Sequence, residues 1–353
     1  MKIIMKNIHG GDIYNNKVNM DFSVNINPLG IPDAVKKAIN DAVEKCDRYP
    51  DISCTGLKAA VAEALAQNGN EITQENIVFG NGASELFMAI VHALKPKKAV
   101  IPVPSFYGYE YALSAVCCEK KYCYTDLENG ADASRIISGL NEETDIIFLA
   151  NPNNPTGQLM DLKEVTAILE YCHSKKIYVV MDECFIDFCE AVESVVKLTE
   201  QYDNLIVIRA FTKIYAIPGV RLGYMVCGNV ALREKIQKKL PEWNVSVIAQ
   251  AAGIACIKEK DYIRQTKKYV ASQRKLLTES LRKYGFKVYE SSADFILFYS
   301  KIRLYEPLLE KGILIRDCSN YEGLSDGYYR IAVKTEAENK ELLKVIGECI
   351  EKY

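Results

Sequence analysis

The chain has little that would place it in several common protein classes. Its 353 residues include only three histidines, and none of them has the spacing typical of metal ligands. The formal net charge of -2 gives no basis for a nucleic-acid or membrane-surface partner. No apolar run reaches the length of a membrane-spanning helix. The opening MKIIMKNIHGGD soon turns polar, so no signal peptide is expected.

Cysteine is abundant, but its positions argue against a disulfide framework. There is no CxxC pair, Cys117 and Cys118 are adjacent, and others such as Cys172, Cys227 and Cys256 lie within apolar runs. Buried thiols of this kind are typical of proteins that fold in a reducing compartment. We therefore expect reduced cysteines, a cytoplasmic location and no bound metal.

Strand-like and helix-like patterns alternate through the middle of the chain. Four near-continuous apolar runs cover Ala99–Pro104, Asp145–Ala150, Ile177–Asp182 and Asn204–Phe211. Such runs predict parallel strands that are buried on both faces, and hence a layered α/β domain. A nicotinamide enzyme would share this alternation, but no GxGxxG follows an early strand.

The pattern changes after Trp243. A helical stretch over Val247–Tyr284 is followed by short strands, a helix near Arg303–Glu310 and a final helix over Glu336–Glu351. This succession predicts a small α+β domain. Near the other end of the chain, Ile31–Cys46 predicts one amphipathic helix that is opened by a proline.

One lysine carries most of the functional signal. The run FTKIYAIPGVRLGY places Lys213 directly after an apolar strand, and Arg221 follows eight residues later. A lysine at the end of a buried strand is costly as a cation, unless its amine forms an imine with an aldehyde cofactor. Two further runs, NPNNPTG (Asn151–Gly157) and VVMDECF (Val179–Phe185), also lie at strand ends, where α/β sheets bind ligands.

With these motifs the chain resembles the pyridoxal-phosphate (PLP) enzymes of the class I and II aminotransferase superfamily, fold type I, over nearly its whole length. The resemblance implies a large, mostly parallel-sheet domain over residues 45–243 and a smaller α+β domain over 244–353, against which residues 1–44 pack. It also implies a homodimer, in which Tyr49 reaches the cofactor phosphate of the other subunit. A surface turn before Pro50 is the alternative for Tyr49.

The cofactor phosphate needs donors and a cation. Gly82, Ala83 and Ser84 precede or open an amphipathic helix, where small residues let backbone N–H groups approach an anion. A simple helix cap at Ser84 explains the same residues. In the superfamily, an arginine at the spacing of Arg221 supplies the cation.

The cofactor ring has its own requirements. The resemblance assigns Asp182 to the pyridine nitrogen, Asn154 to the ring 3-oxygen and Phe106 to the ring face, with Thr212 beside the lysine. The alternatives are that Asp182 caps a strand, that Asn154 forms a turn and that Phe106 packs in the core. The usual tyrosine three residues after the aspartate is Phe185 here, which removes one hydrogen bond to the ring oxygen.

The ends of the chain point to the reaction. IHGGDIY, MDFSVNINPLGIP and ILIRDCSNYEGLSDGYYRIAV resemble L-threonine O-3-phosphate decarboxylases of cobalamin biosynthesis. Histidinol-phosphate aminotransferases share the second and part of the third segment but are not expected to have the HGG start. Decarboxylation of a phosphorylated amino acid is therefore expected, with transfer of an amino group to 2-oxoglutarate as the alternative.

Four residues are expected to contact the substrate. By resemblance, Arg330 binds its carboxylate or phosphate end, Arg316 and His9 are assigned to its phosphate, and Asn27 positions it near the cofactor. A structural salt bridge or cap is the alternative for each. Some members of the superfamily are gene regulators fused to a DNA-binding module, but this chain has no helix-turn-helix extension.

Overall fold

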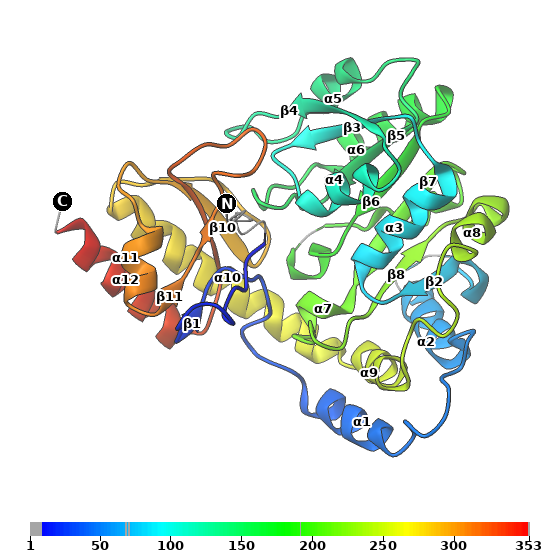
Figure 1. The fold of residues 1–353 in the computed structure, drawn as a ribbon, viewed down its shortest axis with the longest axis horizontal. Coiled ribbons are helices and arrows are strands. Elements are labelled where there is room, and N and C mark those ends of the chain that lie inside the picture. Colours follow the sequence, from blue (N-terminus) through cyan, green and yellow to red (C-terminus); the bar gives the residue numbers. More distant parts are fainter. Residues whose placement is uncertain (1–8, 68, 70, 191, 352–353) are drawn as a thin grey trace, which may run out of the picture.

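Two larger sheets and one two-stranded sheet, with their helices, make up the described part of the protein (Figure 1). The computed structural model describes residues 9–351, except residues 68, 70 and 191. The larger sheet has seven strands in the order β2-β8-β7-β6-β5-β3-β4. Its strands are β2 (Ile77–Gly80), β3 (Lys98–Val103), β4 (Glu119–Tyr124), β5 (Ile146–Ala150), β6 (Tyr178–Asp182), β7 (Leu205–Ala210) and β8 (Gly223–Val226).

The parallel strands predicted from the four apolar runs are confirmed. β3, β5, β6 and β7 pair in parallel, and only β8 runs antiparallel to its neighbours β2 and β7. The segments IIFLA and LIVIRA are buried almost throughout, as a strand covered on both faces requires. Because β5, β6 and β7 are parallel, their last residues Ala150, Asp182 and Ala210 lie along one edge of the sheet.

Helices cover the larger sheet and connect its strands. They are α2 (Thr55–Ala66), α3 (Ala83–Leu94), α4 (Tyr107–Ser114), α5 (Ala133–Gly139), α6 (Leu162–Ser174), α7 (Phe211–Ile214) and α8 (Val230–Gln237), with the short 3-10 turns η1 (Gln74–Asn76), η2 (Ile186–Phe188) and η3 (Val195–Thr199). At α6 the side chain of Asp161 accepts from the backbone of Glu164, and the side chain of Glu164 accepts in return. This capping box fixes where the helix starts.

The smaller sheet lies on the other side of the molecule (Figure 1). It is antiparallel in the order β12-β13-β10-β9, and α10, α11 and α12 lie beside it. The N-terminal strand β1 pairs in parallel with β11, which joins the start of the described chain to this part of the protein. The elements are β1 (Met20–Asp21), β9 (Lys287–Val288), β10 (Phe295–Tyr299), β11 (Ile313–Leu314), β12 (Arg316–Asp317), β13 (Tyr328–Ala332), α10 (Lys260–Lys283), α11 (Tyr305–Glu310) and α12 (Glu336–Ile350).

The long helix expected over Val247–Tyr284 is two helices. α9 (Val247–Ile257) ends before Glu259, whose backbone leaves the helical region, and α10 begins at Lys260. The break has a packing reason, because α9 lies against α1 and α2, whereas α10 lies against α12 and β9. The expected helix after Pro32 is present as α1 (Asp33–Val43). The domain boundaries at residues 44 and 243 stay a prediction.

Some kinds of site are missing from the part of the chain that the structure describes. No helix in it has both the length and the apolar character needed to cross a membrane. Its histidines, cysteines and carboxylates form no cluster of three that could hold a metal ion. All twelve cysteines fall within it, and none is in a disulfide.

Candidate active site

A cavity of about 200 Å³ lies at the carboxyl ends of β5, β6 and β7. Ala150, Asp182 and Ala210, the last residues of these strands, line it. The start of α3, other loops of the larger sheet, the smaller sheet and the N-terminal segment contribute the rest of the wall. The other residues that line the cavity include His9, Gly10, Ser23, Asn25, Ala83, Ser84, Phe106, Asn154, Cys184, Phe185, Thr212, Lys213, Arg221, Tyr321 and Arg330.

Lys213 reaches this cavity from α7, which starts directly after β7. Its Nζ atom lies 6.0 Å from the centre of the Phe185 ring. Burial lowers the pKa of Lys213, and the negative charge of Asp294 opposes that effect. A lysine of this kind loses its proton more readily than one in water, which suits a nucleophilic amine.

Asp182 ends β6 and is held by two donors. The hydroxyl of Tyr109 donates to its Oδ2 over 2.5 Å, and the backbone N–H of Cys184 donates to its Oδ1 over 2.9 Å. Burial raises the pKa of Asp182, whereas the hydrogen bonds from Cys184 and Tyr109 lower it. The carboxylate is therefore oriented and kept receptive to a positively charged partner in the cavity.

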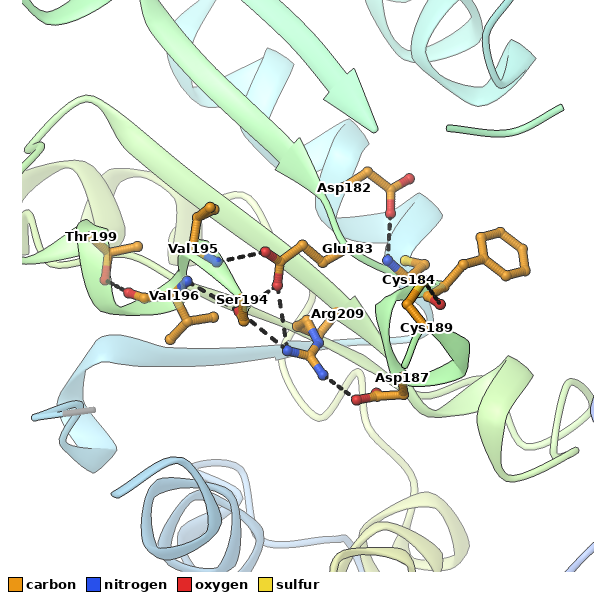
Figure 2. A network of polar contacts seen from close by, with 11 residues as sticks. Asp182, Glu183, Cys184, Asp187, Cys189, Ser194, Val195, Val196, Thr199 and Arg209 are labelled. Atoms are coloured by element: carbon orange, nitrogen blue, oxygen red, sulfur yellow. Dashed lines mark hydrogen bonds and ion pairs between the residues drawn. The ribbon is translucent and has the colours of Figure 1, made fainter. Parts of the chain in front are cut away.

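A buried ion network lies behind Asp182 (Figure 2). The next residue, Glu183, accepts from the hydroxyl of Ser194 over 2.5 Å and from the backbone of Val195 over 2.8 Å. Arg209 of β7 contacts both Glu183, at 3.4 Å, and Asp187, at 2.6 Å. This network ties the end of β6 to β7, four residues before the reactive lysine, and so fixes the two strand ends relative to each other.

The N-terminus of α3 faces the cavity without a side-chain cap. Its N-cap residue is Gly82, with φ of 82°, so Ser84 is not the cap. A Cβ atom at Gly82 would come within 2.5 Å of Nη2 of Arg221, so only glycine lets the guanidinium approach this helix end. Free helix N–H groups beside an arginine form an anion site of the kind that binds phosphate.

Arg330 of β13 closes the opposite side. Its Nη1 donates to Oδ1 of Asn154 over 2.5 Å, and its Nη2 donates to the backbone oxygen of Ser23 over 2.8 Å. The guanidinium also lies over the Phe295 ring, at 5.4 Å from its centre. Because Asn154 accepts with its oxygen, its side-chain N–H group is the part left for a ligand.

The HGG run packs against Ser23, the residue that also contacts Arg330. The backbone N–H of Gly11 donates to the hydroxyl of Ser23 over 2.7 Å, and a Cβ at Gly10 would come within 2.3 Å of the Ser23 carbonyl oxygen. His9 therefore sits in the cavity wall, with the ring of Phe106 at 6.1 Å. Burial lowers the pKa of His9, and the positive charges of Arg316 and Lys213 lower it further.

Comparison with known proteins identifies the family. The family described as aminotransferase class I and II matches residues 17–346. The chain belongs to this family. A protein of Caldanaerobacter subterraneus subsp. tengcongensis, provisionally named threonine-phosphate decarboxylase, is 38% identical over 96% of the chain and 92% of its own length. Threonine-phosphate decarboxylase of Salmonella typhimurium is 32% identical over 94% of the chain and 91% of its own length.

A solved structure shows the same fold. Histidinol-phosphate aminotransferase from Clostridium acetobutylicum superposes with a TM-score of 0.88 and 32% sequence identity, over 95% of this chain and all of that one. The fold is thus the PLP-dependent fold type I expected from the sequence, and PLP is the cofactor of the family.

The residues of the cavity fit PLP. The uncapped end of α3 with Arg221 suits its phosphate, Asp182 its ring nitrogen, and Lys213 its aldehyde carbon. Asn25 faces the cavity with a buried Oδ1 that has no hydrogen-bond partner among the described residues, as expected of a site shaped for a polar ligand. A Cβ atom at Gly108 would clash with the Phe106 ring, so glycine at this position allows the ring to line the cavity.

Most of the residues predicted from the sequence gather here. His9, Ala83, Ser84, Phe106, Asn154, Asp182, Thr212, Lys213, Arg221 and Arg330 line the cavity, and Gly82 caps the helix beside it. Their individual roles stay predictions.

Three predicted residues lie outside the cavity wall. Asn27 is buried, and its amide donates to the backbone oxygen of Ile214 and to Thr266, both over 2.7 Å, so it holds the segment after Lys213 rather than the substrate. Arg316 lies behind the Tyr321 ring, 5.1 Å from its centre. Tyr49 is 78% exposed, away from the cavity of its own chain.

Sequence reasoning missed two residues that matter to this geometry. Tyr109 lies three residues after Phe106 in the same PSFYGY run, so its place on the first turn of α4 was the available signal. Ser23 contacts Arg330 through a backbone oxygen, which no side-chain pattern can reveal.

Proposed function

We propose that the enzyme decarboxylates L-threonine O-3-phosphate, giving an aminopropanol phosphate for cobalamin biosynthesis. The observation that carries the proposal is the place of His9. It belongs to the HGG run, which resembles the decarboxylases, and it lines the cavity together with Lys213 and Arg330. The 38% and 32% identities to threonine-phosphate decarboxylases support the same reaction.

The proposed substrate has two acidic groups, and the site offers cations for both. Arg330 is held in place by Asn154 and by the Ser23 carbonyl, so its planar guanidinium is set to bind one acidic group. We assign the substrate phosphate to His9, and we propose that Arg316, outside the cavity wall, attracts the phosphate through its charge, which is close enough to lower the pKa of His9. Asn27 receives no substrate contact, because its amide is engaged within the protein.

In the proposed reaction PLP, when bound, draws electrons from the substrate α-carbon. The bond from that carbon to the carboxylate breaks, CO₂ leaves, and the electron pair stays on the α-carbon. Lys213 then supplies a proton from its nitrogen to this carbon, a step that its lowered pKa favours. Asp182 supplies the anion that a protonated ring nitrogen needs.

Amino transfer to 2-oxoglutarate, as in histidinol-phosphate aminotransferases, is the second candidate. The observation that favours it is the TM-score of 0.88 to such an enzyme at 32% identity. In that reaction Lys213 would remove a proton from the α-carbon and return it at the aldehyde carbon of the cofactor, instead of adding a proton to the α-carbon. The substrate bond held perpendicular to the cofactor ring breaks, so the position of the carboxylate decides between the two reactions.

A direct assay separates these reactions. The PLP-loaded protein is incubated with L-threonine O-3-phosphate alone and, separately, with histidinol phosphate plus 2-oxoglutarate, and mass spectrometry follows both mixtures. We expect loss of CO₂ in the first mixture without any keto acid. Glutamate formed in the second mixture, with no CO₂ released in the first, would establish the aminotransferase.

We further propose that the enzyme is a homodimer. The rings of Tyr49 and Trp243 pack with centres 4.9 Å apart and planes tilted by 36°, although 78% and 43% of the surfaces of these residues are exposed. Such an exposed aromatic pair suits a face covered by a second copy of the chain. Analytical ultracentrifugation should give twice the mass of 39.7 kDa, and Tyr49→Ser with Trp243→Ser should shift the protein toward monomer. A wild-type monomer at micromolar concentration would refute the dimer.

A further inference from the structure

Asp294 is a fully buried carboxylate. It directly precedes β10 in the smaller sheet and has no exposed surface. Neither of its carboxylate oxygens has a hydrogen-bond partner among the residues that the structure describes. Its backbone carbonyl accepts a hydrogen bond from the N–H of Val333 over 2.7 Å. Because an unpaired buried charge is unfavourable, a carboxylate left in this state calls for an explanation.

The residue after Asp294 packs against the aromatic ring that lies beside the reactive lysine. The following residue, Phe295, packs edge-on against Phe185, with ring centres 5.1 Å apart and planes at 81°. Two positively charged groups lie near these rings. Nζ of Lys213 lies 6.0 Å from the centre of the Phe185 ring, and the guanidinium of Arg330 lies 5.4 Å from the centre of the Phe295 ring. The residue after Asp294 therefore belongs to an aromatic pair that contacts both Lys213 and Arg330.

The charged surroundings of Asp294 come from several elements. Burial raises its pKa to about 7, against the opposing effect of the cations around it. The titratable groups that interact with its charge are Lys213 of α7, Arg330 of β13, Lys334 after β13, Arg274 of α10 and the thiol of Cys189.

The interaction between Asp294 and Lys213 is reciprocal. Burial is the main cause that lowers the pKa of Lys213, and Asp294 is the strongest influence in the opposite direction. Lys213 is likewise the strongest influence that lowers the pKa of Asp294. Arg221 and Arg330 act on Lys213 in the same direction as burial, and the carboxylate of Asp182 also interacts with the charge of Lys213. Asp294 is therefore the main counter-charge of the lysine.

We propose that Asp294 is a positioning residue for Lys213: its unpaired carboxylate supplies the negative charge that keeps the lysine nitrogen able to hold a proton inside a buried, cation-rich site. The inference rests on the proposed role of Lys213 as the residue that binds PLP. Above neutral pH the ionised carboxylate favours a protonated lysine nitrogen. Below neutral pH the carboxylate takes up a proton and this support disappears, so the two groups titrate as a coupled pair.

The test compares Asp294→Asn with Asp261→Asn, an aspartate on α10 whose side chain is 77% exposed. The visible absorbance of each PLP-loaded protein is titrated with pH. We expect the midpoint to fall by about one pH unit in Asp294→Asn, which is about tenfold weaker proton binding, and to stay unchanged in Asp261→Asn. An unchanged midpoint in a folded Asp294→Asn protein would overturn the proposal.

A second measurement needs neither the cofactor nor a variant. The reactivity of Lys213 in the wild-type apoprotein toward acetic anhydride is followed over pH by mass spectrometry, relative to an exposed lysine such as Lys36. We expect a two-step profile for Lys213, with one step near neutral pH where Asp294 titrates. A single-step profile would contradict the proposal.

Should Lys213→Ala still form the visible PLP chromophore, the assignment of Lys213 itself would fail, which is a different result from either outcome for Asp294.

Discussion

Nη1 of Arg330 donates a hydrogen bond of 2.5 Å to Oδ1 of Asn154, across 176 residues of sequence. Asn154 lies in the loop after β5 of the larger sheet, and Arg330 lies on β13 of the smaller one. Both side chains are buried. This bond therefore couples a residue predicted to touch the cofactor with one predicted to touch the substrate, and it joins the two sheets at the cavity.

Replacing Arg330 with lysine should lower kcat/KM by about 30-fold or more. Lysine keeps the charge but cannot donate to Asn154, Ser23 and an acidic substrate group in one plane. PLP binding, followed by its absorbance, should change little, because Asp182, Lys213 and Arg221 are retained. Steady-state kinetics checks the prediction, with Arg282→Lys on the exposed face of α10 as the matched control. Equal kcat/KM in both variants would contradict it.

Tyr109→Phe should move the acid limb of the activity profile. The Tyr109 hydroxyl lowers the pKa of Asp182, against burial, which raises it. Without this donor the pKa of Asp182 rises further, so the carboxylate becomes protonated at a higher pH and activity on the acid side falls. We expect a shift of about one pH unit in kcat/KM. Tyr111→Phe, 61% exposed on the same helix, should leave the profile in place. A profile that shifts equally in both variants would argue against this role.

Gly82→Ala should weaken PLP binding by about tenfold to a hundredfold. Alanine would have to adopt φ of 82°, and its Cβ would push against Arg221, so both halves of the phosphate site would move. Titration of the apoprotein with PLP measures the effect. Gly285→Ala is a matched control, because Gly285 has the same φ of 82° but open space around a Cβ. Gly285→Ala should lower the stability of the protein without changing its affinity for PLP. If this control also lost affinity, the loss in Gly82→Ala would come from general destabilisation and not from the phosphate site.

The sequence predicts those parts of the fold and site that depend on local patterns. The strands at Ile146–Ala150, Tyr178–Asp182 and Leu205–Ala210 were visible as apolar runs, and their parallel order brings Asn154, Asp182 and Lys213 together. These residues follow strand ends, so topology alone gathers them.

The remaining features depend on contacts between distant segments. The break between α9 and α10 follows from their different packing partners, and nothing in the local pattern marks it. Asn27 was expected at the substrate, but its amide is used by Ile214 and Thr266, far away in sequence. No local pattern marks Asp294 as buried, and only the folded structure shows that its carboxylate has no hydrogen-bond partner among the described residues.

Asp294→Asn should also change how stability depends on pH. The pKa of Asp294 is about 7 in the folded protein, compared with an ordinary value of 3.8. Between these values the folded state binds the proton more tightly than the unfolded state. The corresponding stabilisation is fully present below pH 3.8 and is lost as the pH rises through about 7. The loss is up to roughly 4 kcal/mol in the free energy of unfolding.

The asparagine variant removes this titration, so its stability should fall less steeply between pH 4 and 7 than that of the wild type. Urea unfolding of the apoprotein at several pH values measures both curves. Asp261→Asn should follow the wild type, because that carboxylate is exposed. Parallel curves for the wild type and Asp294→Asn would mean that the buried carboxylate keeps an ordinary pKa, and that the cations around it balance its burial completely.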